Sequence, residues 1–430
     1  MKIRLLILAF LSAPAALLAQ PYDTKAEIMA DIAKAGGKYY AYEMVPQQMT
    51  AAPAGYKPFY ISHMGRHGSR YALGNKVYSD LYVFFSKADS AGVLTAEGKA
   101  LKRRYDAFYK LVAYREGELT RKGQEQHRFI ASRMYADFPE VFEGKTAGSA
   151  ISTSSHRVLV SMHSFLDEIK SLDPDFSCEV DYGRIYLPVL MPNSYDSPQR
   201  VHSVRLPKDV RRQQSGFEKA SYDYDGITRR WFTDVDFVRK NFKGRRNLIR
   251  NLNVVIMDIS SLDNPGPDNF MDVFSSEELY GIWRAGNFRD YLRYGRAPQV
   301  DNSVVKAMAV CAEDFISKAE EDFRSGLALR LRFSHDVAMM PLMAYLKVNG
   351  FGAEISDPDE VEKWFRNFEI PMACNFQLVF FRNAKGNIII KPLLNGKEAT
   401  LPISQAAPSF YSWKDFKAYC LGLQKEAEGK

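Results

Sequence analysis

Residues 58–70 read PFYISHMGRHGSR, and this stretch decides the fold. Its first part, residues 58–64, is short, aromatic and β-branched and is bounded by a glycine, which predicts a buried strand. Its second part places Arg66, His67 and Arg70 directly after the carboxyl end of that strand. Cationic side chains need partners when they leave water, so this cluster is either a solvated surface turn or a site that holds an anion.

Strands and helices alternate through the rest of the chain. In residues 327–334 leucine and phenylalanine alternate with smaller or charged residues, which predicts a second strand, and the small residues 149–155 predict a third that ends in a turn. Helices are predicted over 75–112, 120–135, 156–169, 303–323 and 336–346, and a strand hairpin over 375–381 and 387–394. Strands interleaved with helices predict an α/β fold with a central, mostly parallel sheet flanked by helices.

Residues 176–299 differ from the sequence on both sides. They are irregular and rich in Tyr, Asp, Arg and Pro, with helical pieces around 232–257 and 275–293. We therefore expect an inserted, mainly helical cap subdomain at 176–299. The α/β core is then formed by residues 20–175 together with residues 300–430.

The N-terminus and the cysteines bear on the cell compartment. Residues 1–19 carry Lys2 and Arg4 ahead of an apolar run and end in small residues, which predicts a signal peptide and export to the periplasm or the medium. That run is too short for a membrane anchor, and no later stretch predicts a membrane span. In an oxidising compartment the cysteines can form up to two disulfides or stay as buried thiols, and their pairing is open. They are Cys178, Cys311, Cys374 and Cys420.

The positive charge of the chain is concentrated in one segment. The chain has 58 Lys and Arg against 51 Asp and Glu, and residues 205–250 alone contain thirteen bases and six acids. Such a region attracts anionic partners, or it is a solvated helical face. Aromatic residues in the same segment, Tyr222, Tyr224, Trp231 and Phe232, would suit stacking on nucleic-acid bases. No nucleic-acid-binding module is recognisable, however, so no nucleic-acid partner is expected.

Three polar clusters follow predicted strands: residues 66–70, residues 152–157 and the pair His335-Asp336. In α/β sheets, ligands bind outside the carboxyl ends of the strands, so we expect these clusters to converge. A phosphate monoester dianion is the ligand that they suit best. Arg66, Arg70 and Arg157 offer guanidinium forks that match phosphate oxygens, and Arg157 stands at the start of a helix, where backbone N–H groups also attract anions.

The histidines and the aspartate supply the chemistry. A neutral imidazole can attack phosphorus, and the neighbouring arginines favour the neutral form, which makes His67 the candidate nucleophile. His335 is expected to act as a further cationic hydrogen-bond donor to the transferring group. Asp336 is expected to protonate the leaving oxygen and later to deprotonate water. Activity should then favour acid pH unless burial raises the pKa of Asp336.

The chain resembles the histidine acid phosphatase branch of the histidine phosphatase superfamily, which includes acid phosphatases, phytases and multiple inositol polyphosphate phosphatases. The resemblance rests on Arg66-His67-Gly68-x-Arg70 after a strand and on a distal His335-Asp336. It extends to residues 119–123, Ser152-Thr153-x-x-x-Arg157 and residues 394–396. It implies that His67 is phosphorylated, that Arg66, Arg70, Arg157 and His335 bind the phosphate, and that Asp336 is the proton donor.

Two departures from the family pattern bear on the subgroup. Ala72 stands where the family often has proline, and His335-Asp336 stands where the inositol polyphosphate phosphatases usually have His-Ala-Glu. The predicted function is an exported phosphomonoesterase that acts on small phosphate esters, either inositol polyphosphates in the manner of a phytase or a broad range of esters in the manner of an acid phosphatase. The alternatives are a phosphoryl mutase of the same superfamily and a non-catalytic module that binds anionic ligands.

The remaining histidines are expected to be structural or exposed; they are His63, His127, His156, His163 and His202. His156 and His163 lie seven residues apart on one predicted helix, but no third ligand accompanies them. The mechanism needs neither a metal nor a cofactor, and none is predicted. The oligomeric state is open.

Overall fold

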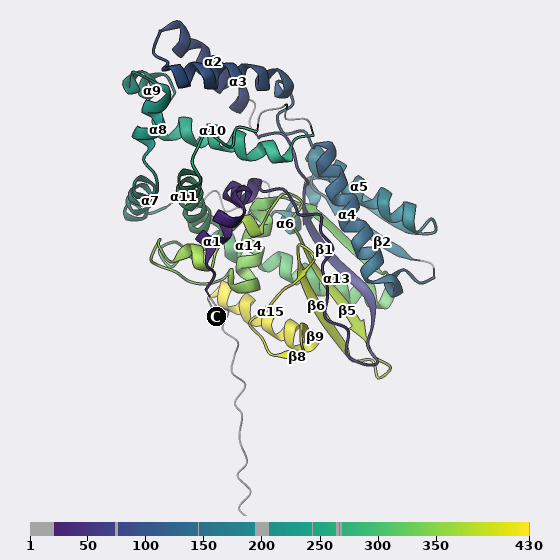
Figure 1. Cartoon of the computed structure of the whole chain (residues 1–430). Coiled ribbons are helices and arrows are strands. Elements are labelled where there is room, and N and C mark those ends of the chain that lie inside the picture. The colour runs from purple at the N-terminus through teal and green to yellow at the C-terminus, as the bar shows by residue number, and fades with distance from the viewer. Residues whose placement is uncertain are drawn as a thin grey trace, which may run out of the picture.

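One sheet organises the structure. The computed structural model describes residues 21–73, 76–144, 146–193, 206–242, 244–263, 266 and 269–429, so the predicted signal peptide and His202 lie outside the described residues. The strand order is β3-β2-β4-β1-β5-β6-β9-β8, with β7 paired to β6 (Figure 1). The strands are β1 (Lys57–Arg66), β2 (Ala147–Ser152), β3 (Ser177–Tyr182), β4 (Leu329–Ser334), β5 (Asn375–Arg382), β6 (Ile388–Leu394), β7 (Lys397–Glu398), β8 (Gln405–Ala407) and β9 (Phe410–Ser412).

The sheet has a parallel half and an antiparallel half. Strands β3, β2, β4 and β1 pair in parallel, whereas β5 joins β1 antiparallel and the remaining strands continue antiparallel. The register pairs Ser152 with Phe333 and Arg66 with Ser334, so the carboxyl ends of β2, β4 and β1 lie level with one another. The predicted α/β class is confirmed, and the predicted hairpin is the β5–β6 pair.

Helices cover both faces of the sheet. On one face, α4 (Arg121–Asp137) and α5 (His156–Leu172) bury their apolar sides against alternate residues of β1, β2 and β4. On the other face, residues of α12 to α15 form a second cluster with the opposite side chains of β1 and β5. The helices of this second face are α12 (Ser303–Lys306), α13 (Ala309–Ser325), α14 (Asp336–Tyr345) and α15 (Trp413–Glu428). Figure 1 shows α4 and α5 stacked side by side along the parallel half of the sheet.

A separate helical region lies beyond the carboxyl ends of the parallel strands (Figure 1). Its apolar cluster includes residues of the 222–285 segment, as expected for a helical cap, but also residues of α2 and α3. The break between α2 and α3 falls at Thr95, whose hydroxyl accepts from the Gly98 N–H and begins α3. The helices of this region are α2 (Val77–Ser90), α3 (Ala96–Val112), α7 (Lys208–Ser221), α8 (Tyr224–Trp231), α9 (Val235–Asn241), α10 (Arg245–Asp258) and α11 (Ser276–Tyr294). The division of the chain at residues 176 and 299 stays a prediction.

Short elements complete the described chain. They are α1 (Thr24–Ala30), α6 (Leu187–Leu190) and the 3₁₀ helices η1 (Ile32–Tyr39), η2 (Pro139–Phe142), η3 (Arg184–Tyr186), η4 (Ile259–Ser261), η5 (Val348–Gly350), η6 (Val361–Lys363) and η7 (Asn367–Glu369). The four cysteines all lie in described residues and all are free thiols. Within the described ranges, no helix has the length and apolar character needed to cross a bilayer.

Candidate active site

The level ends of β1, β2 and β4 bring the predicted site residues together. Arg66 ends β1 and His67 follows it; His335 and Asp336 follow β4; Arg157 lies in the first turn of α5, after β2. The rings of His67 and His335 lie 5.5 Å apart between centroids, and an Arg157 Nη2 atom lies 3.3 Å from His335 Nδ1. Residues separated by up to 270 positions in the sequence therefore form one site, because parallel strands all end at the same edge.

His67 is held in a defined orientation and in its neutral form. Its backbone N–H donates to the Ser334 carbonyl at 3.1 Å, and its own carbonyl accepts from the Ala373 N–H at 2.9 Å. Nδ1 lies 2.9 Å from the Gly68 carbonyl, which can only accept, so Nδ1 carries the proton and Nε2 carries the lone pair. Burial, together with the charges of the nearby arginines, lowers the pKa of His67 well below its ordinary value. Nε2 is buried and has no hydrogen-bond partner among the described residues.

Gly68 permits a close approach between the loop and α4. A side chain on Gly68 would place its Cβ 2.3 Å from the Gly123 carbonyl, and one on Gly123 would lie 2.2 Å from the Ser69 carbonyl. Thr120 begins α4 by accepting from the Gly123 N–H at 3.1 Å, as expected for an N-cap. The segment 119–123 therefore supports the loop of residues 67–70 from behind. Glycine at 68 is explained by this helix contact.

Three arginines present cationic N–H groups around His67. Arg66 is fully buried, and its Nη1 donates to the carbonyls of Lys38 and Ile370 at 2.6 and 2.9 Å. Its Nε and Nη2, and the Nε atoms of Arg70 and Arg157, are buried without hydrogen-bond partners among the described residues. Burial lowers the pKa of Arg157, assisted by the charge of Arg70, to about 10. Buried cationic donors without partners make a preformed anion site.

His335 differs from the expectation of a cationic donor. Its Nδ1 accepts from Arg157, and its Nε2 lies 3.2 Å from the Thr153 hydroxyl, so the ring is neutral with the proton on Nε2. Burial and the charge of Arg157 lower the pKa of His335 to about 3. The role of His335 as a cationic donor to a bound phosphate stays a prediction, because the arginines that repel a proton from this ring would be neutralised in part by an anion.

Asp336 lies among cations. One carboxylate oxygen is 3.7 Å from Arg66 Nη2, and the other is 3.8 Å from Lys38 Nζ. Burial acts to raise the pKa of Asp336, but the charges of Arg66, Lys38 and Arg70 outweigh burial and hold the pKa below its ordinary value. The carboxyl is also the first residue of α14, where the helix dipole favours negative charge. Without ligand, Asp336 is ionised.

Two charged residues at this site were not predicted from the sequence. Lys38 ends η1 close to the site, and its Nζ lies 3.3 Å from Asp290 of α11 as well as near Asp336. Asp258 ends α10 and has an oxygen 4.0 Å from Arg70 Nη1. The sequence feature that could have drawn attention to Lys38 is the Gly36-Gly37 pair directly before it. Gly37 has φ +55°, and a Cβ there would lie 2.6 Å from Asn367, so the chain needs glycine at this position. Asp258 has no comparable signal in its surroundings.

The basic segment is partly neutralised. Arg230 pairs with Glu278, and Arg250 pairs with Glu218. Both pairs join helices of the cap region, so these charges contribute to its packing. A pocket next to the site is lined by Lys38, Arg250, Arg289 and neighbouring residues, and Arg289 is half-buried there.

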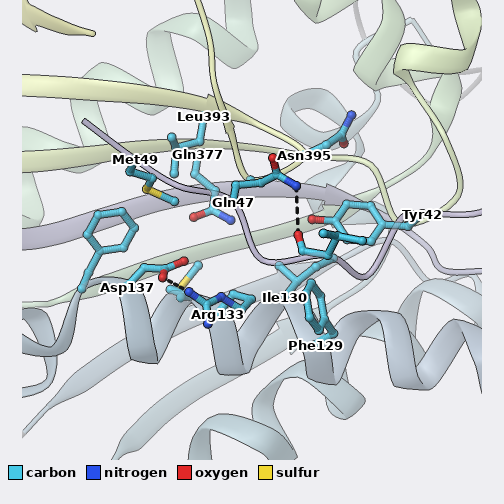
Figure 2. Close-up of a pocket in the computed structure, with 14 residues that line it drawn as sticks. Tyr42, Gln47, Met49, Phe129, Ile130, Arg133, Asp137, Gln377, Leu393 and Asn395 are labelled. Carbon is cyan, nitrogen blue, oxygen red and sulfur yellow. Dashed lines mark hydrogen bonds and ion pairs between the residues drawn. The ribbon is translucent and has the colours of Figure 1, made fainter. Parts of the chain in front are cut away.

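Another pocket lies away from the site. Figure 2 shows it between α4 and the β5–β6 strands, with Arg133 and Asp137 paired on one wall and Gln377 on the other. None of the six predicted site residues lines it. His63 and His127 are fully buried behind the site against Phe333, while His156 and His163 are exposed. Among the described residues, no group of His, Cys, Asp and Glu could hold a metal ion.

Comparison with solved structures agrees with the fold. The multiple inositol polyphosphate phosphatase of Bifidobacterium longum in complex with inositol hexasulfate superimposes with a TM-score of 0.71 at 18% identity, covering 89% of this chain and 97% of that chain. The same enzyme in complex with phosphate also gives 0.71 at 18% identity, covering 90% and 98%. A phytase of D. castellii gives 0.68 at 13% identity, covering 93% and 88%. No family model and no curated protein sequence matches the chain.

At these identities the likeness shows a shared fold. The architecture is that of these inositol polyphosphate phosphatase and phytase structures, so the fold that the resemblance implies is confirmed. The departure at His335-Asp336 leaves this agreement intact, because it concerns the residues that follow β4 and not the strand order.

Proposed function

We propose that the protein is a phosphomonoester hydrolase that acts through a phosphohistidine intermediate. The observation that carries the proposal is the His67 Nε2 atom, which has a free lone pair inside a ring of buried cationic N–H groups. Arg66, Arg70 and Arg157 bind the oxygens of the phosphate dianion, and His335 donates to it once the bound charge favours its protonation.

The reaction has two displacements. His67 Nε2 attacks phosphorus, the ester P–O bond breaks, and Asp336 gives its proton to the departing oxygen. Asp336 then takes a proton from water, the resulting hydroxide attacks phosphorus, and the N–P bond breaks to release phosphate. Asp336 must be protonated for the first step. Binding of the substrate dianion favours this protonated form. The dianion neutralises part of the charge of Arg66 and Arg70, which otherwise lower the pKa of Asp336, so that pKa rises.

We propose inositol polyphosphates as the substrate class. Two of the structures that superimpose on this chain are an inositol polyphosphate phosphatase, described in complex with inositol hexasulfate, and a phytase. In this chain, the pocket beside the site is lined by Lys38, Arg250 and Arg289 and by the acids Glu218 and Asp290, so its wall carries a small excess of positive charge. A substrate with several phosphates would place one at His67 and others along this wall. The predicted signal peptide assigns the reaction to the periplasm or the medium.

The test is phosphate release from phytate and from an aryl phosphate at pH 3 to 8, for the wild type and His67→Ala. We expect release that is greatest at acid pH and falls by about 10⁴-fold or more in the variant, since nothing replaces the nucleophile. His163→Ala, an exposed histidine on α5, is the control. Full activity in His67→Ala would refute the mechanism. Transfer to an added alcohol without phosphate release would indicate a mutase, and binding without turnover would indicate an anion-binding module.

A further inference from the structure

Asp258 is a buried carboxylate that the proposed mechanism does not use. It is the last residue of α10 and is fully buried. Neither carboxylate oxygen has a hydrogen-bond partner among the described residues. Burying such a group costs free energy, and a compact apolar residue would fill the space without that cost. Its presence therefore calls for an explanation.

The groups that face Asp258 are those of the phosphate site. Arg70 Nη1 lies 4.0 Å from Oδ1, and Arg66 and the Tyr78 hydroxyl of α2 are the other charged or titratable neighbours. Burial raises the pKa of Asp258 to about 7, against the lowering effect of Arg70 and Arg66. Asp258 is thus the acidic group that faces the guanidinium of Arg70.

Arg70 has few other restraints. Its Nη1 donates to the Tyr71 carbonyl at 3.0 Å, its Nε has no partner among the described residues, and the ring of Tyr39 lies 5.6 Å from its Cζ. A guanidinium binds phosphate well only when its fork is held at the right angle. The Arg70 side chain is buried, and this backbone hydrogen bond is one of the polar contacts that hold it. The carboxyl group of Asp258, which faces Nη1, adds a further polar restraint on that angle.

The same corner of the cap region has a second attachment to the loop. The Thr120 hydroxyl oxygen lies 2.9 Å from both the Ser69 carbonyl and the Ser261 carbonyl and shares its single proton between them. Ser261 ends η4, three residues after Asp258. Figure 1 shows α10 running across the cap region toward the ends of α4 and α5, where this contact is made. The end of α10 therefore faces Arg70 directly, and η4 is linked to Ser69 through the Thr120 hydroxyl.

From these contacts we propose that Asp258 is a positioning residue, which orients the Arg70 guanidinium toward the phosphate from the cap side. The proposal rests on the proposed function, because it assigns Arg70 to phosphate binding. It also makes α10 part of the phosphate site, although α10 contributes no group that touches the substrate.

The test compares Asp258→Leu with Asp258→Asn. Leucine fills the space but has no oxygen that can interact with the Arg70 guanidinium. We expect kcat/KM for an aryl phosphate to fall by about 10-fold or more, and competitive inhibition by inorganic phosphate to become weaker. The melting temperature should fall, because the substitution leaves the buried Arg70 guanidinium without its facing carboxyl group. Asparagine keeps an oxygen facing Arg70 and should restore most of the activity. The control is Asp322→Asn, which removes a buried carboxylate that contacts Tyr60 and Arg330 away from the site; it should lower stability and leave kcat/KM unchanged.

A background variant separates positioning from folding. In an Arg70→Ala background, Asp258→Leu should change kcat/KM by less than about twofold, because Asp258 acts through Arg70. A folded Asp258→Leu protein with wild-type kcat/KM would overturn the inference. If Asp258→Leu does not fold, Asp258→Ser takes its place. Wild-type kcat/KM in folded Asp258→Ser would likewise overturn the inference. A wild type that neither hydrolyses esters nor binds phosphate would instead overturn the proposed function.

Discussion

The strand ends and the cap region face the same site but build it in different ways. The strand ends contribute groups in short sequence motifs, such as Arg66-His67 and His335-Asp336, whose backbones are fixed by a parallel sheet. The cap side contributes single residues, Lys38, Asp258 and Asp290, from separate elements. The sheet therefore fixes where the proposed reacting groups lie, while the residues of the cap side place charges next to them.

The first prediction tests the strand side, where the largest effect should fall. Asp336→Asn removes the proton donor and should lower kcat by about 10²–10⁴-fold for esters with poor leaving groups. The loss should be much smaller for an aryl phosphate with an acidic leaving group, because that oxygen departs without help. Measuring kcat against leaving-group pKa for both proteins checks this. Equal losses across the series would contradict the role of Asp336 as a general acid.

The sequence predicted the strand side well for a physical reason. A strand that ends in Arg66-His67 and one that ends in His335-Asp336 carry their functional side chains with them, so locating the strand locates the group. The N-cap role of Thr120 and the hairpin of β5 and β6 were likewise local features. The protonation states were harder, because the neutral form of His335 depends on Arg157, which lies 178 positions earlier in the chain.

The cap side escaped prediction because its contacts are not local. Asp258 ends an ordinary helix, and only the tertiary fold places it next to Arg70. Lys38 lies in a short 3₁₀ helix and pairs with a residue of α11 that is 252 positions away. The basic segment 205–250 was visible as charge, but the partners that neutralise Arg230 and Arg250 were not.

The second prediction tests the cap side through Lys38. Lys38→Met removes one of the cations that hold the pKa of Asp336 down, so that pKa should rise. Because the general acid must be protonated, the alkaline limb of kcat/KM against pH should move to higher pH by about half a unit to one unit. Lys38→Arg keeps the charge and is the matched control. The substrate ionises in the same way for the wild type, Lys38→Met and Lys38→Arg, so it cannot cause a difference between them. An alkaline limb at the wild-type pH in Lys38→Met would show that Lys38 does not lower the pKa of Asp336.

The last prediction concerns stability behind the site, where substitution should affect the chemistry least. Burial holds the pKa of His63 and of His127 at about 3, against an ordinary value of 6.5. Between these values the unfolded chain binds protons that the folded chain does not, so stability is full above pH 6.5 and is lost as pH falls toward 3. Each histidine should contribute a slope of about 1.4 kcal/mol per pH unit in this window.

Urea unfolding at pH 7, 6, 5 and 4 measures that slope. His127→Gln removes one titrating group, so its stability should fall less steeply with acid than that of the wild type, whatever packing it loses at pH 7. His163→Gln, at an exposed position of α5, should keep the wild-type slope. An unchanged slope in His127→Gln would mean that the folded protein protonates this ring. A changed slope would show that a neutral, buried His127 contributes to the loss of stability in acid.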